Sequence, residues 1–171
     1  MAMRHNMNQT MKSILTIFAV IFFITTASPL LSQDNGEEIN LAAIADNQKF
    51  ENAKHFYDMK LYDKSLREMN EYLEIYATGA HRKAAFMTVG SIHFKRFDYP
   101  RAVKAYSSLY EEFSNSEEGI QAYFNVAICY QKMGRDKKAR EILKEIIEDH
   151  PDTRESAMAR TQMDLLDIID R

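Results

Sequence analysis

Apolar residues recur along most of the chain at intervals of three and four positions, which places them on one face of an α-helix. From about residue 42 onward, only short polar or Gly- and Pro-containing segments interrupt this pattern. The pattern predicts an all-α fold of seven helices joined by short turns. The expected helices span residues 42–59, 63–76, 80–96, 100–113, 117–133, 137–149 and 154–169.

A shift of the sequence by 37 residues brings three segments into register. Each unit places one small residue in a helix and a second small residue twelve positions later, in the next helix. Two antiparallel helices approach closely only where side chains are small, so each unit is predicted to be a helix hairpin. These pairs are Ala53 with Ser65, Gly90 with Ala102, and Ala127 with Ala139.

Turn and capping residues mark the ends of the expected helices. Pro100 suits the first turn of a helix, where its missing N–H costs nothing. Gly134 suits a helix end that needs a positive φ. The boundaries between units carry side chains that can accept a hydrogen bond from the first turn of the next helix. The expected N-caps are Thr78, Asn115 or Ser116, and Asp152 or Thr153.

This spacing of small, aromatic and capping positions resembles the tetratricopeptide repeat family over residues 49–169. In the third unit the matching positions are Ala127, Tyr130, Gly134, Ala139, Leu143, Ile146 and Pro151. The resemblance implies a solenoid of antiparallel helix hairpins with a C-terminal capping helix. The repeat domain is expected to span 47–171, with units at about 47–83, 84–120 and 121–157 and a cap at 154–171.

The resemblance also implies a binding groove, because the first helix of each hairpin lines the concave side of such a stack. Such a groove accepts a helix or an extended peptide. The implied groove residues are Phe50, Lys54, Tyr57, Asp58, Met87, Ser91, Phe94, Lys95, Phe124, Ile128, Gln131 and Lys132. Four of them fit the groove and the core between units equally well: Phe50, Met87, Phe124 and Ile128. Exposure is expected for Tyr57, Phe94, Gln131 and Lys132.

The first 32 residues predict a secretory signal peptide, because a basic segment precedes a short apolar run and a zone of small residues. The apolar run covers residues 14–24, which is short for a membrane-spanning helix of ~20 residues. An uncleaved segment that anchors the chain in the inner membrane is the alternative. A polar leader is expected at 33–46, between the signal peptide and the repeats.

Charge and chemical motifs narrow the function classes. The net charge is −3, whereas nucleic-acid binders usually carry a basic surface, so nucleic-acid binding is not expected. The one cysteine, Cys129, rules out an intrachain disulfide and falls in an apolar run, where we expect an inert core thiol. The histidines show no metal-binding spacing, and His93 and His150 share the aromatic packing positions of the repeat. No catalytic residues, metal site or cofactor are predicted, and we do not expect an enzyme.

These features predict an exported scaffold that holds an envelope protein or peptide in its groove. The export signal and the repeat together are similar to bacterial envelope members of the family. Examples are the helical-repeat lipoprotein of the outer-membrane β-barrel assembly machine and the periplasmic Tol–Pal-associated coordinator of cell division. A periplasmic location, with a role in outer-membrane assembly or cell-division coordination, follows as an expectation of that resemblance.

Two alternatives belong to other function classes. The last helix is apolar on more than one side near 165–169, which fits a homo-oligomer that associates through residues 157–169. A cell-wall-directed enzyme is the less favoured alternative, because no acids, bases or metal ligands converge in the sequence. Contact with a membrane is expected only through an uncleaved N-terminal segment or through a partner.

Overall fold

Seven α-helices and no strand make up the described part of the chain, which is residues 40–169 of a computed structural model. The helices are α2 (Leu41–Asp58), α3 (Tyr62–Ile75), α4 (Arg82–Lys95), α5 (Tyr99–Phe113), α6 (Glu117–Lys132), α7 (Asp136–Asp149) and α8 (Arg154–Ile169). Each expected helix is present, with its ends within two residues of the prediction. The predicted signal peptide and the first half of the predicted leader, residues 33–39, lie outside the described residues.

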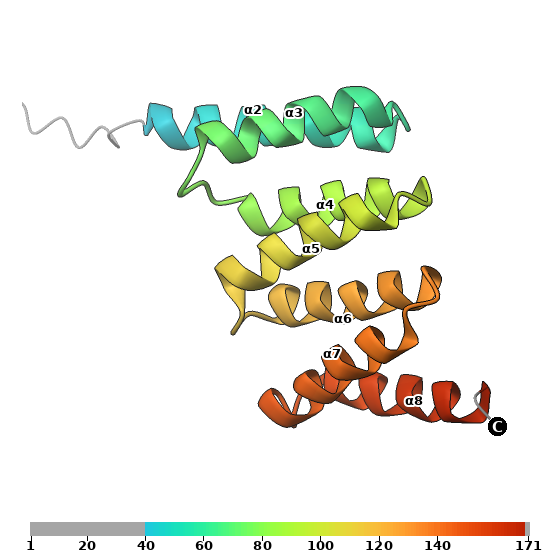
Figure 1. The fold of residues 1–171 in the computed structure, drawn as a ribbon. Coiled ribbons are helices and arrows are strands. Elements are labelled where there is room, and N and C mark those ends of the chain that lie inside the picture. The colour runs from blue at the N-terminus through green and yellow to red at the C-terminus, as the bar shows by residue number, and fades with distance from the viewer. Residues whose placement is uncertain (1–39, 170–171) are drawn as a thin grey trace, which may run out of the picture. The chain divides into compact units, whose positions relative to one another are not determined.

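The helices form three antiparallel hairpins that stack in chain order, α2 with α3, α4 with α5, and α6 with α7, and α8 follows the last hairpin (Figure 1). Consecutive helices pack against each other throughout. The first helices also touch across units, since α6 contacts both α4 and α8. We call α2, α4, α6 and α8 the first-helix row. The predicted all-α repeat of helix hairpins is confirmed.

A small residue lies at the crossing point of every hairpin. Ala53 and Ala127 in the first helices are fully buried, and so are Ala102 and Ala139 in the second helices. In the first hairpin Ser65 takes the second position, and its buried Oγ donates to the carbonyl of Ala53 at 3.0 Å. That hydrogen bond satisfies the hydroxyl inside the core, so the polar side chain is tolerated there.

The middle hairpin crosses more tightly than alanine would allow. A Cβ added at Gly90 would lie 2.4 Å from a ring carbon of Tyr106 in α5. The residues 37 positions before and after Tyr106 are Met69 and Leu143, which are not aromatic. The Tyr106 ring therefore explains why this unit has glycine at position 90, because the ring occupies the space that a side chain there would need.

The three hairpin turns share one backbone conformation. Lys60, Phe97 and Gly134 are spaced by 37 residues and have φ of 61°, 60° and 68°. The positive φ predicted for Gly134 is confirmed. In the other two turns a residue with a side chain takes the left-handed conformation, which costs roughly 1–2 kcal/mol. Phe97 is also 77% exposed, so the second turn combines backbone strain with an exposed aromatic residue.

The N-cap predictions hold at two of three boundaries. The Ser116 Oγ accepts a hydrogen bond from Gly119 N at 3.1 Å, and the Thr153 Oγ1 accepts one from Ser156 N at 3.2 Å. The prediction for Thr78 is wrong, because α4 begins only at Arg82.

Long-range partners replace the local cap before α4. The Asp46 carboxylate accepts a hydrogen bond from Ala80 N at 2.8 Å, and the Tyr72 hydroxyl accepts one from His81 N at 3.0 Å. Asp46 is buried and belongs to α2, which begins at Leu41. The first helix thus starts inside the predicted leader at 33–46, and its first turns fix the loop before α4.

We predict that Gly90→Ala destabilises the fold by about 1–3 kcal/mol, because the new methyl group would overlap the Tyr106 ring. In a Tyr106→Leu background the same substitution should instead stabilise α4, by up to about 1 kcal/mol, because alanine is the better helix former. Urea unfolding of the four proteins of this double-mutant cycle measures both effects. A destabilisation of equal size in both backgrounds would contradict the explanation.

Candidate functional site

The twelve residues predicted to line a groove occupy four equivalent positions in α2, α4 and α6. At the first position Phe50 and Phe124 are buried, whereas Met87 is half-buried. The Phe50 ring stacks on the ring of His81 with centroids 4.4 Å apart. Phe50 and Phe124 thus belong to the core and do not line a groove.

The other three positions are more accessible. Tyr57, Phe94, Gln131, Ser91 and Ile128 are half-buried, and Lys54, Asp58, Lys95 and Lys132 are exposed. The exposure expected for Lys132 is therefore found, whereas Tyr57, Phe94 and Gln131 are only partly accessible. The Phe94 ring meets the Tyr99 ring of α5 edge to face at 5.5 Å, which holds it against the core.

Side chains link α2 to α4 along the first-helix row. The Lys95 Nζ donates to the Tyr57 hydroxyl at 2.5 Å, and the Ser91 Oγ lies 3.4 Å from the same oxygen. The Lys95 ammonium also lies 4.6 Å from the centroid of the Tyr57 ring. The hydrogen bond from Lys95 lowers the pKa of the Tyr57 hydroxyl and raises the pKa of Lys95. The structure thus brings together three of the predicted residues.

Two further polar contacts continue the row toward the C-terminus. The Asn125 amide of α6 lies 3.8 Å from the sulfur of Met87 in α4. The Gln162 amide of α8 donates to the side-chain oxygen of Gln131 in α6 at 2.9 Å. Asn125 and Gln162 were not among the predicted residues. Each first helix is therefore tied to the next by side chains, so the row forms one connected surface.

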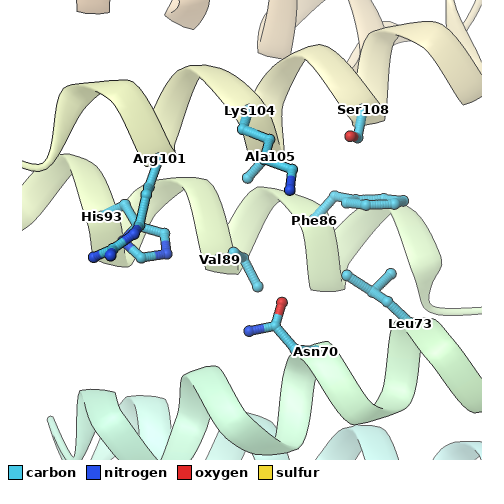
Figure 2. A pocket seen from close by; sticks show the side chains of 9 residues that line it. All are labelled: Asn70, Leu73, Phe86, Val89, His93, Arg101, Lys104, Ala105 and Ser108. Atoms are coloured by element: carbon cyan, nitrogen blue, oxygen red, sulfur yellow. The ribbon is translucent and has the colours of Figure 1, made fainter.

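A cleft of about 300 Å³ lies on the other side of α4, between α3 and α5 (Figure 2). Its lining residues are Asn70, Leu73, Phe86, Val89, His93, Arg101, Lys104, Ala105 and Ser108. We call it the α3–α5 cleft. At 100° per residue the α4 members of this lining project nearly opposite to those in the first-helix row. Sequence reasoning missed this cleft.

A second cleft, of about 240 Å³, repeats the first one unit later, between α5 and α7. We call it the α5–α7 cleft. It is lined by Ser107, Tyr123, Val126, Tyr130, Lys138, Glu141, Ile142 and Glu145. Every one of these residues stands 37 positions after a residue of the α3–α5 cleft. The two clefts are therefore the same feature of the hairpin stack, built from different side chains.

The α5–α7 cleft is filled more fully by its own side chains. The Tyr123 ring stacks on Tyr110 with centroids 4.1 Å apart, and its hydroxyl donates to the Glu145 carboxylate. In the α3–α5 cleft the residues equivalent to Tyr110 and Ile142 are the smaller Leu73 and Ala105. This loss of side-chain bulk was visible in the aligned repeats and is the signal that could have revealed the cleft.

The two clefts also differ in charge. The α5–α7 cleft carries Lys138 with two acids, whereas the α3–α5 cleft carries Arg101 and Lys104 and is lined by no acid. Arg101 pairs with Asp98 at 2.8 Å. Lys104 is exposed and forms no ion pair with any residue of the described chain. The α3–α5 cleft thus presents a cation that no acid among residues 40–169 neutralises.

His93 lies in the α3–α5 cleft in a largely apolar setting, with its Nδ1 3.6 Å from the Asp98 carboxylate. Burial lowers the pKa of His93 below its usual value of 6.5, and the positive charges of Arg101 and Arg96 act in the same direction. The Asp98 carboxylate opposes them. The net effect keeps the imidazole neutral at pH 7.

Three features of the described residues concern the thiol, metal-binding side chains and membrane-spanning helices. Burial raises the pKa of the Cys129 thiol to about 12, so the thiol stays protonated and unreactive. No group of three or more metal-binding side chains occurs between residues 40 and 169. Over the same residues, no helix has the length and apolar character needed to cross a bilayer.

Comparison with known proteins agrees with the hairpin geometry. Residues 121–153, which cover most of α6, all of α7 and the turn that follows, match the model of the tetratricopeptide repeat family. No curated protein matches the chain. The same hairpin recurs twice before the matched segment at the 37-residue spacing, so the described part of the chain is a tetratricopeptide-like helical repeat. Such repeats act as protein–protein interaction scaffolds.

The lowered pKa of His93 predicts a pH-dependent stability. Because the folded protein holds this imidazole neutral, its contribution is complete above pH 6.5 and is lost as the pH falls below that value. The midpoint temperature of thermal unfolding should therefore fall more steeply between pH 7 and pH 5 for the wild type than for His93→Gln. The other histidines are common to both proteins and cancel. Parallel profiles would show that His93 titrates as it does in the unfolded chain.

Proposed function

We propose that this protein is an exported scaffold of the bacterial cell envelope that holds a partner protein or peptide along its first-helix row. The observation that carries the proposal is the set of side-chain contacts joining α2 to α4, α4 to α6 and α6 to α8. These contacts let several units act as one binding surface. A stack of similar hairpins needs such continuity to recognise a segment longer than one unit.

The row offers the mixture of groups that peptide recognition uses. Half-buried apolar side chains such as Met87 and Ile128 share their helices with exposed charges such as Lys95 and Lys132. Apolar contacts supply most of the binding free energy of an interface, and charges at its rim set partner choice and the rate of association. The row therefore suits a partner segment with apolar anchors and flanking charges.

The location in the envelope rests on the N-terminal sequence. A basic segment, an apolar run at 14–24 and a zone of small residues up to Ser32 support export through a signal peptide. Release into the periplasm is the primary proposal, and an inner-membrane anchor through the uncleaved segment is the alternative. Outer-membrane assembly and cell-division coordination are the two envelope processes in which we place the scaffold.

Site-specific photocrosslinking in the native cell tests this proposal. A photocrosslinking amino acid placed at Lys132 or Lys54, which are exposed in the first-helix row, should capture one and the same envelope protein. Matched control positions are Glu74 in α3 and Lys144 in α7, which are also exposed but belong to second helices. Equal capture from row and control positions, or a cytoplasmic partner, would contradict the proposal.

A second candidate, self-association through the last helix, is favoured by one observation. Leu165 and Ile168 of α8, the last helix of the described stack, are 48% and 66% exposed and so offer an apolar surface for a second copy. If two copies pair through this helix, Ile168→Glu should convert a dimer to a monomer in light-scattering measurements at high protein concentration. A wild-type protein that is monomeric under those conditions removes the candidate.

A further inference from the structure

We propose that the α3–α5 cleft is a second binding site, which takes one large apolar side chain of an acidic segment of a partner protein. The cleft uses α3, α5 and the face of α4 turned away from the first-helix row. Its support is independent of the function proposed for that row.

The dimensions of the cleft fit a single side chain. About 300 Å³ is at the lower end of the ~300–1,000 Å³ found for ligand pockets, and too small for a helix. The apolar walls come from three helices, with Leu73 from α3, Phe86 and Val89 from α4, and Ala105 from α5. A buried apolar or aromatic anchor in a pocket of this kind is the usual centre of a protein interface.

The charged and apolar lining residues are separated along the cleft. Figure 2 shows Arg101 and His93 at one end, Phe86 and Leu73 at the other, and Lys104 between them on α5. Lys104 has no acidic partner in the described chain. An occupant that buries an apolar group against Phe86 would therefore bring its neighbouring groups near Lys104 and Arg101. Carboxylates at those points are favoured.

Two polar side chains beside the apolar walls favour a peptide over a small apolar acid. Asn70 on α3 and Ser108 on α5 both line the cleft, and both carry hydrogen-bond donors and acceptors. An extended peptide has backbone N–H and C=O groups on either side of each side chain, and these groups need partners when water is excluded. A small amphiphilic acid has no such groups to match them.

The equivalent cleft in the next repeat lacks the lysine and the small residue found at the positions of Lys104 and Ala105. In the α5–α7 cleft, Glu141 replaces Lys104, Ile142 replaces Ala105 and Glu145 replaces Ser108. These side chains narrow that cleft to about 240 Å³ and place two acids beside its lysine. Because the hairpin geometry is common to both units, the larger volume and the basic character of the α3–α5 cleft come from its side chains.

This internal comparison supplies the test variants. Ala105→Ile and Lys104→Glu copy residues that the adjacent unit already accommodates, so both should preserve the fold. The first should narrow the cleft, and the second should reverse the charge at position 104. A random peptide library displayed on phage is selected on the full chain, and peptides that also bind Ala105→Ile are removed. Enriched peptides should combine an aromatic or large aliphatic residue with neighbouring Asp or Glu.

Fluorescence anisotropy with the enriched peptides then measures affinity. Ala105→Ile and Lys104→Glu should each weaken binding by about tenfold or more, and added salt should weaken binding to the wild type. Two controls should leave the affinity unchanged: Glu141→Lys in the α5–α7 cleft and Lys144→Glu, which is exposed on α7 and lies in neither cleft nor the first-helix row. Circular dichroism and thermal unfolding confirm that each variant is folded.

Several outcomes would overturn the inference. The proposal is wrong if no peptide discriminates the wild type from Ala105→Ile, or if the enriched peptides lack acids. Displacement of the peptides by decanoate, together with direct decanoate binding that Ala105→Ile abolishes, would assign the cleft to a small amphiphilic acid. Loss of crosslinking from Lys132 would leave the peptide result standing, so the two proposals fail separately.

Discussion

The close approach of two helices at one small residue is the contact on which the rest of this fold depends. Ala53, Gly90 and Ala127 are all buried at the hairpin crossings. A larger side chain there would push the helices apart and expose the apolar residues on either side of the crossing. The positive φ at the end of each first helix then turns the chain back at a fixed angle. With both features repeated every 37 residues, the hairpins stack in one regular direction.

That regularity separates architecture from chemistry. The residues at the crossings are all small, whereas the residues around the two clefts differ at most of their equivalent positions. Ala105 and Ile142 occupy the same place in successive units, yet the cleft beside Ala105 measures about 300 Å³ and the one beside Ile142 about 240 Å³. Binding properties can therefore differ between neighbouring units without a change in backbone.

The sequence predicts helix positions and hairpin pairing well, because both depend on local periodicity and on small residues that the alignment of repeats reveals. It fails where distant segments meet. Thr78 was expected to cap a helix, but Asp46 and Tyr72 reach that loop from other helices. Phe50 was left open between groove and core, and its burial follows from stacking on His81, which is 31 positions away in the chain. The α3–α5 cleft is lined by three helices, so the small side chain of Ala105 indicates a cleft only once the packing of all three helices is known.

The pairing of Gly90 with Tyr106 also limits how such repeats can be recombined. Ala127 in place of Gly90 would bring a methyl group into the Tyr106 ring, so α6 cannot simply be transplanted into the position of α4. A whole hairpin, which carries both members of the pair, avoids that overlap. Gene duplication or engineering that exchanges complete hairpins would thus preserve the packing, whereas a crossover inside the turn at Phe97 would join mismatched halves.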